Sequence, residues 1–459
     1  MAGVGFSLRS LRTEDSYTGL VRLYGAAGVI SSGPWLISIL TLLVIGVVGR
    51  SLVPDGAMLT RFQVSVTWLF AASLVLSGPL QLAFTRYIAD RAYLDEDDAT
   101  PPSLIGALAV TSAIAAAASL ALSPLFAGET LALRVLLGLG LITLCDTWIV
   151  LVVLTGLREH TQVLWSFALG YGVAFAGTLA LAPFGTEGML AGFVAGQGAL
   201  LVRSLFVVLK KMPSRAPVEL GFLDYRKLHG ELLLIGLFYN LGIWADKLLF
   251  WLKPDVSRQV LGPMRASEVY DLPIFLAYLT IVPGMAVFLV RVETDFAERH
   301  HAFYAAIRDG ASLRRIEPLC TEMTASARRA VADIAKVQGL TLALCFAFGR
   351  QMLAFFGISE LHLPLFYVDA VGVSLQVLLL AVTSMFFYLD RKREVVWLSL
   401  LLLSTNAALT WVSQQLGPEL YGYGFAVAMC ATSVVALAQL TRVFRSLTRD
   451  TFMLQPVAP

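Results

Sequence analysis

Runs of about twenty apolar residues recur along the whole chain, and they constrain its fold more than any other feature. A helix of this length crosses the hydrocarbon core of a bilayer. Membrane β-strands instead alternate apolar and polar residues over about ten positions, a pattern not seen here. We expect an all-α polytopic membrane protein with about twelve spans. The expected spans are residues 24–48, 63–86, 103–126, 131–155, 162–182, 187–209, 231–252, 268–291, 338–357, 365–389, 394–416 and 421–441.

The composition excludes most soluble classes. Hydrophobic residues make up 57% of the 459 residues and charged residues 14%, whereas a soluble domain has about 25% charged residues. The four cysteines are scattered without CxxC spacing, so neither a disulfide framework nor a metal site is expected. The first 22 residues are polar and mixed in charge, which is not typical of a cleavable signal peptide.

A polar segment divides the expected spans into two sets of six. Residues 210–230 hold Pro213, Pro217 and several basic side chains, as a linker between lobes would. We therefore expect an N-terminal lobe over residues 1–209 and a C-terminal lobe over residues 231–459.

Lys and Arg are distributed unevenly between the two sides of the membrane. If the N-terminus is inside, 26 of the 34 Lys and Arg residues fall in or beside inner segments and 8 in or beside outer segments. Cytoplasmic loops carry the excess of positive charge in membrane proteins. Both termini are therefore predicted to be cytoplasmic, which requires an even number of spans.

The longest polar segment, residues 292–337, is predicted to be a cytoplasmic loop. Val292, Phe296, Phe303 and Ile307 recur at helical spacing. One or two amphipathic helices lying on the membrane or on a partner protein are expected. The alternative is a basic loop held only by anionic lipid.

No catalytic motif is present. The sequence contains no HExxH, GxSxG or Walker A motif, and its five histidines have no ligand spacing. We expect a transporter and not an enzyme, without a cofactor or a metal.

Two spans carry the same Ser-Gly-Pro interruption, at Pro34 and at Pro79. Proline removes one backbone hydrogen bond and kinks a helix. These kinks are candidate gating points, and the alternative is a static bend. Glycines at every fourth residue of another span, 188, 192 and 196, predict close helix packing.

Polar residues within apolar spans are the main candidates for a transport path. In the seventh expected span, Tyr239 and Asp246 share one helix face, and Asn240 and Lys247 share the next, with Trp244 nearby. Ionisable groups are costly in hydrocarbon and usually face an interior path. The alternative is a structural Asp246–Lys247 pair near a helix end. Further candidates in other spans are Asp146, Asp271 and Asp369.

Several stretches resemble the PelG family, the inner-membrane transporter component of the Pel exopolysaccharide machinery. These are MAGVGFSLRSL at the start, YGAAGVISSGPWLISI at 24–39, ELLLIGLFYNLGIWADKLLFW at 231–251 and RVETDFAER at 291–299. The family belongs to the superfamily of polysaccharide flippases and multidrug extruders. The resemblance implies two six-helix lobes around a central cavity that opens alternately, in a bacterial inner membrane.

The resemblance also implies a substrate and partners. The substrate would be a polymer rich in N-acetylgalactosamine and galactosamine, exported for a biofilm matrix. The partners would be a cytosolic glycosyltransferase, a membrane protein that senses cyclic di-GMP and a further membrane subunit. The segment 292–337 and the N-terminal segment are the candidate docking surfaces.

Three alternatives to polymer export remain open at this point. A flippase for a lipid-linked oligosaccharide needs a cationic site for pyrophosphate, and Lys247 is the one cation well inside an expected span. A small-cation antiporter needs a buried carboxylate, a role open to Asp146 or Asp246. A membrane scaffold for the synthase would need no transport path.

Overall fold

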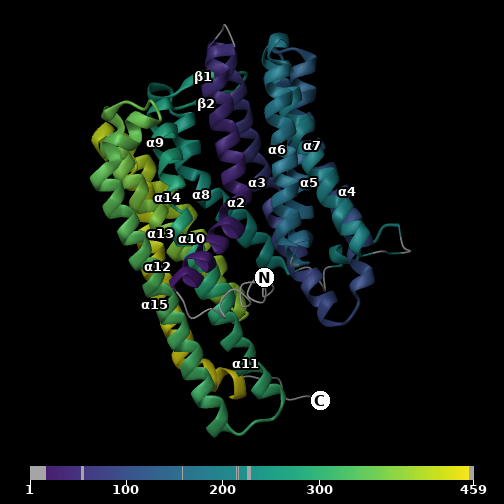
Figure 1. Cartoon of the computed structure of the whole chain (residues 1–459), viewed down its shortest axis with the longest axis vertical. Coiled ribbons are helices and arrows are strands. Elements are labelled where there is room, and N and C mark those ends of the chain that lie inside the picture. The colour runs from purple at the N-terminus through teal and green to yellow at the C-terminus, as the bar shows by residue number, and fades with distance from the viewer. Residues whose placement is uncertain are drawn as a thin grey trace. The chain divides into compact units, whose positions relative to one another are not determined.

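The fold is a bundle of long helices (Figure 1). The computed structural model describes residues 17–52, 56–157, 159–212, 214, 217–224 and 229–453. In these ranges ten helices are long and apolar enough to cross a membrane, and twelve if each of two bent helix pairs is one span. The prediction of an all-α protein with about twelve spans is confirmed. The N-terminal segment proposed for docking lies outside the described residues.

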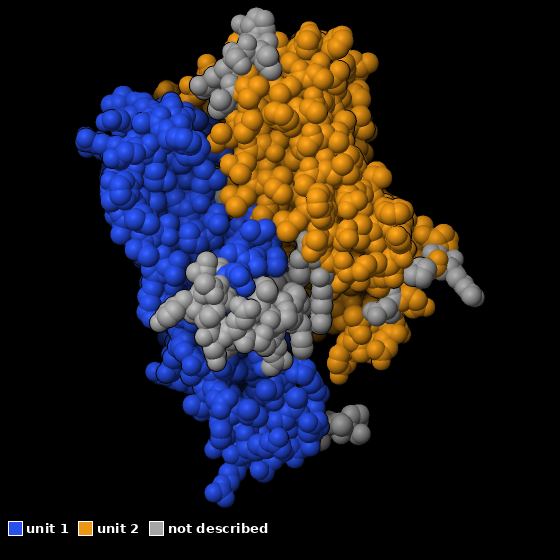
Figure 2. Space-filling model, in the orientation of Figure 1, with its two compact units in different colours: residues 1–32, 269–459 blue, residues 33–268 orange. Residues whose placement is uncertain are grey.

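By its internal contacts the chain forms two compact units, coloured separately in Figure 2. One unit comprises residues 33–268 and the other comprises residues 1–32 with 269–459. These bounds differ from those of the expected lobes, because α8 (Gly230–Leu252) packs on α3 (Gly56–Tyr93) in the first unit. The division into lobes at 210–230 stays a prediction.

The unit of residues 33–268 has one continuous apolar core. Buried side chains of α3 and α5 supply much of this core, and α5 packs on α3, α4 and α7. Two prolines begin α4, where their missing N–H groups are not needed. The further helices are α4 (Thr100–Leu122), α5 (Leu131–Gly156), α6 (His160–Ala180) and α7 (Gly185–Lys211).

Glycines bring α6 and α7 into backbone contact, as the small-residue stripe predicted. A Cβ on Gly192 would lie 2.2 Å from the carbonyl carbon of Gly177, and one on Gly196 would lie 2.5 Å from Ala174. No side chain fits in either gap. The packing interpretation of the stripe is confirmed.

A short β-hairpin follows α8, and the sequence analysis did not predict it. Strands β1 (Arg258–Leu261) and β2 (Met264–Ala266) pair antiparallel. Gly262 turns between them with φ of +50°, and a Cβ there would lie 2.6 Å from the Phe126 ring. The hairpin is therefore held tightly against the bundle.

The unit of residues 1–32 and 269–459 contains the remaining helices. Helix α13 packs on α12 and α15, and α14 packs on α15. Helices α9 and α10 bend by 40° at the break between them. The elements are α9 (Glu268–Leu279), α10 (Val282–Val290), a π-helical turn (Arg291–Phe296), α11 (Ala297–Arg308), α12 (Leu313–Phe355), α13 (Leu363–Tyr388), α14 (Lys392–Leu416) and α15 (Tyr423–Met453).

The segment 292–337 is helical, but it is not a separate loop on a surface. Its second half is the start of α12, which continues without a break into the apolar stretch. The apolar face of this half is buried within the unit, at Ile316, Met323, Ala330 and Ile334. Of the face predicted at Val292, Phe296, Phe303 and Ile307, the first three side chains are also buried within the chain, and the docking of this segment on the membrane or on a partner stays a prediction.

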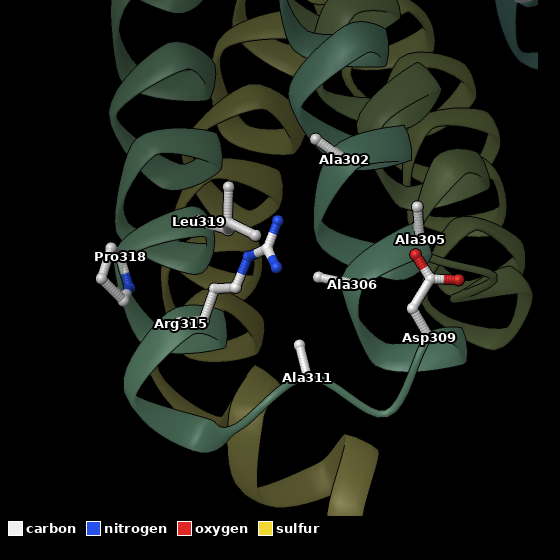
Figure 3. Close-up of a pocket in the computed structure, with 8 residues that line it drawn as sticks. All are labelled: Ala302, Ala305, Ala306, Asp309, Ala311, Arg315, Pro318 and Leu319. Atoms are coloured by element: carbon white, nitrogen blue, oxygen red, sulfur yellow. The ribbon is translucent and has the colours of Figure 1, made fainter.

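A pocket opens where α11 turns into α12. Small side chains line it, and Arg315 extends into it across from Asp309 (Figure 3). Arg315, Asp309 and Pro318 are all exposed to solvent. The pocket is a solvated recess of the α11–α12 turn.

Candidate functional site

Three tryptophans form a cluster between α3 and α8. The ring centroids of Trp68 and Trp251 lie 4.7 Å apart, and those of Trp244 and Trp251 lie 6.0 Å apart. The indole N–H of Trp68 donates to the carbonyl oxygen of Arg265, at 2.9 Å, which ties the cluster to the β-hairpin. Trp251 is buried, whereas Trp68 and Trp244 are half-buried and retain exposed ring surface.

An ion pair lies one turn from this cluster. The Lys247 Nζ lies 3.0 Å and 3.2 Å from the two carboxylate oxygens of Asp246, and it also donates to the carbonyl oxygen of Ile243. Asp246 is 0% exposed and Lys247 is 5% exposed. Lys247 also lies 6.0 Å from the centroid of Trp244. The two charges neutralise one another within α8.

The two other candidates on α8 lie one to two turns earlier. Tyr239 and Asn240 are both half-buried, and the Asn240 amide donates to the Gly236 carbonyl oxygen at 2.7 Å. At this level α8 crosses α3 with almost no gap, since a Cβ on Gly236 would lie 2.3 Å from the Gly78 carbonyl oxygen. The Ser-Gly-Pro segment of α3 is thus the place where α3 meets α8.

The proline interruptions differ in their effect. Helix α2 (Tyr17–Leu52) bends between Pro34 and Leu36, and the boundary of the two units falls two residues earlier. Helix α3 passes through Pro79 as one helix. Pro34 therefore lies at a bend and Pro79 at a contact, and the gating role of both stays a prediction.

Asp146 lies on α5 against α4. Its Oδ2 accepts a hydrogen bond from the Ser112 hydroxyl at 2.6 Å, and its Oδ1 is buried with no hydrogen-bond partner in the described part of the chain. On the same helix, the Trp148 N–H donates to the Ser73 hydroxyl of α3 at 3.1 Å. Polar contacts thus link α3, α4 and α5 inside this unit.

The last two candidates belong to the other unit. Asp369 is fully buried on α13, and Asp271 is half-buried on α9. Two turns after Asp369, the Tyr278 hydroxyl lies 3.1 Å from the Gln376 side-chain oxygen. The structure thus groups Tyr239, Asn240, Trp244, Asp246 and Lys247 on α8, and a single cavity shared with the other aspartates stays a prediction.

The sequence analysis missed a second polar cluster, at the π-helical turn. The Glu293 carboxylate accepts a hydrogen bond from the Tyr388 hydroxyl at 2.9 Å, and Arg291 bridges Asp295 and Asp333 at 2.8 and 2.9 Å. The sequence analysis used the stretch RVETDFAER for its apolar spacing and its family resemblance, but did not predict its charged residues as a site. Its alternation of charged and apolar residues was the one available signal.

The side chains at these sites suit the binding of a polar solute. Aromatic faces stack on sugar rings, and buried polar groups can guide a polar solute. Within the described ranges, no group of three His, Cys, Asp or Glu side chains is placed to hold a metal ion.

Solved structures share this fold. An outward-facing multidrug resistance MATE family transporter of the MOP superfamily aligns with a TM-score of 0.63 and 15% identity, over 92% of this chain and 96% of the other. An inward-facing structure gives 0.63 and 14% identity, over 98% and 99%. A MOP superfamily transporter from Pyrococcus furiosus gives 0.63 and 15% identity, over 96% and 98%.

The family follows from the sequence itself. No curated protein matches the chain. One family does, over residues 1–452, and it is described as an exopolysaccharide exporter, EPS-E. With its multi-pass helical architecture and MATE-like fold, this chain is a membrane transporter that belongs to the PelG family.

Proposed function

We propose that this transporter exports the Pel exopolysaccharide, a polymer rich in N-acetylgalactosamine and galactosamine, for a biofilm matrix. It acts in the bacterial inner membrane, with both termini in the cytoplasm. A cytosolic glycosyltransferase supplies the polymer, and a cyclic-di-GMP-sensing membrane protein and a further membrane subunit complete the complex. The family match over residues 1–452 and the 26-to-8 bias of Lys and Arg support this proposal.

The observation that best supports a polysaccharide substrate is the tryptophan cluster of α3 and α8. A saccharide offers apolar C–H faces and a rim of hydroxyls. The exposed ring surfaces of Trp68 and Trp244 suit those faces. The half-buried Tyr239 and Asn240 lie on the same helix and offer groups that hydrogen-bond with hydroxyls. Stacking and hydrogen bonding of this kind do not need a net charge on the protein, and the Asp246–Lys247 pair provides none.

The charge balance also weighs against a flippase for lipid-linked oligosaccharides. Such a substrate carries a pyrophosphate, which needs an uncompensated cation. Lys247 was the one cation expected well inside a span, and it is held by Asp246 at 3.0 Å. The residues of α8 therefore fit polymer export better than the flipping of a lipid-linked oligosaccharide.

The test uses the native host with the gene deleted and variants restored at equal membrane level. Surface polymer is quantified with an N-acetylgalactosamine-binding lectin. We expect Trp244→Ala to lower surface polymer and Trp244→Phe, which keeps an aromatic face, to retain most of it. Trp411→Ala is the matched control, because Trp411 on α14 is 57% exposed and outside the cluster.

The outcomes of this test distinguish polymer export from a scaffold and from a small-cation antiporter. Full secretion in Trp244→Ala and in Asp246→Asn would favour a scaffold for the synthase over a path along α8. Full secretion in the deletion strain would refute Pel export, and a drug-sensitivity assay of the same strain would then test a small-cation antiporter.

A further inference from the structure

Glu293 is a buried acid in the π-helical turn between α10 and α11. Its side chain is 3% exposed. The Tyr388 hydroxyl donates to Oε2 at 2.9 Å, and Oε1 is buried without a hydrogen-bond partner among the described residues. Single π-helical turns recur at functional sites. Burial of an ionised carboxylate with one oxygen that accepts no hydrogen bond is costly, and a proton on that oxygen lowers the cost by removing the charge.

The two arginines closest in sequence to Glu293 bind other residues. Arg291 binds Asp295 and Asp333 at 2.8 and 2.9 Å. Arg299 donates to the backbone carbonyl oxygen of Asp295 at 2.9 Å. No ion pair joins Glu293 to another residue in the described part of the chain, and the nearest arginine in sequence, Arg291, is paired with Asp295 and Asp333.

Aromatic side chains pack around the tyrosine that binds the acid. The Phe296 ring packs edge-on against Tyr388 at 5.7 Å, and the His300 ring lies 5.4 Å from Tyr388 and 4.6 Å from Tyr304. The titratable and charged groups around the turn come from α2, the turn itself, α11, α12 and α13. They are Tyr24, Arg291, Asp295, Arg299, His300, Tyr304, Asp333 and Tyr388.

We propose that Glu293 is a proton-binding site of this transporter, which carries a proton on Oε1 and releases it during the export cycle. In the protonated state, Glu293 is a neutral carboxylic acid with its proton on Oε1, and the Tyr388 hydroxyl donates to Oε2. On release, the O–H bond of the acid breaks, the proton passes to a water molecule, and the hydroxyl of Tyr388 stabilises the carboxylate left behind. Charge is balanced, because the proton leaves as hydronium.

The position of the Glu293–Tyr388 hydrogen bond explains why release of the proton would be linked to a movement of the helices. The hydrogen bond joins the π-helical turn to the last residue of α13, so ionisation changes how strongly these elements are held together. The place of this step in polymer export rests on the proposed function, whereas proton binding by Glu293 does not.

The first test is an infrared pH titration of the purified full chain in detergent. Wild type should show a carboxylic-acid C=O band that disappears on ionisation and is absent in Glu293→Gln. Glu298→Gln is the control, because Glu298 lies in the next turn and is exposed. Tyr388→Phe, which keeps Glu293, should move the loss of the band to higher pH by about one unit, since the carboxylate loses its donor.

The second test is secretion in the deletion host. Glu293→Gln should lower surface polymer at an unchanged membrane level, and Glu298→Gln should not. An infrared spectrum that is identical in wild type and Glu293→Gln, or a Tyr388→Phe titration that does not move, would overturn proton binding. A lost band with full secretion would overturn its role in export. If the deletion strain still secretes polymer, only the proposed function fails and the infrared result stands.

Discussion

The crossing of α3 and α8 should tolerate no side chain at Gly236. A Cβ at this position would lie 2.3 Å from the Gly78 carbonyl oxygen and 2.7 Å from the Pro79 nitrogen. These are backbone atoms, so the helices must separate by about 1 Å to restore contact distances near 3.5 Å. Overpacking of this kind costs about 1–3 kcal/mol.

The substitution Gly236→Ala measures the cost of this overpacking, after the gain in helix propensity from glycine to alanine is subtracted. Alanine is favoured over glycine within any helix by about 1 kcal/mol. The matched control is Gly198→Ala on α7, where a Cβ would meet nothing within 4 Å. We expect Gly198→Ala to be as stable as wild type or more stable, and Gly236→Ala to be about 1–3 kcal/mol less stable than that control.

The assay follows exposure of a buried thiol during heating in detergent. Cys145 is 0% exposed on α5, and its Sγ lies 3.8 Å from the Ser73 carbonyl oxygen of α3, so it reports opening of this unit to a thiol-reactive dye. The other three cysteines, Cys320, Cys345 and Cys430, are replaced by alanine in all variants, so that only Cys145 reacts with the dye. A midpoint for Gly236→Ala equal to that of Gly198→Ala would refute the close crossing.

Three other changes test further contacts by thermal assays of the same kind. Gly192→Val should abolish folded protein or lower its midpoint strongly, because only backbone of α6 faces that position. Asp246→Asn should destabilise by about 3 kcal/mol, because it removes the carboxylate of a buried ion pair, and adding Lys247→Met should recover part of the loss; no recovery would argue against the pair. The Asp450 carboxylate lies 2.7 Å from Arg391, and Asp450→Asn, followed with the buried Cys345 as the one remaining cysteine, should leave the midpoint nearly unchanged, because both side chains reach solvent and such pairs contribute little.

Hydropathy predicted the spans well because burial in lipid imposes length and composition on every helix. The expected span 131–155 is α5 at Leu131–Gly156, and 394–416 lies within α14 at Lys392–Leu416. Proline and glycine were informative where local geometry decides the outcome, as at the bend near Pro34 and the contact of Gly192 with α6.

Contacts between distant segments could not be predicted in the same way. The Glu293–Tyr388 hydrogen bond joins residues 95 positions apart, and neither residue stands out in its own stretch. The β-hairpin has strands of four and three residues, too short for a clear alternation. The periodicity of 292–337 predicted a helix correctly, but not that its apolar face meets its own chain.

Helix α12 has a mechanical consequence. Its 43 residues extend about 65 Å at 1.5 Å per residue, roughly twice the hydrocarbon thickness of a bilayer. The apolar part of α12 covers only its second half, so a bilayer of ordinary thickness that encloses this half leaves the first half outside the hydrocarbon, as an extension of the same helix. A force applied at the α11–α12 turn would therefore be carried along a single helix, with Pro318 near its start, to the part of α12 that packs on α13.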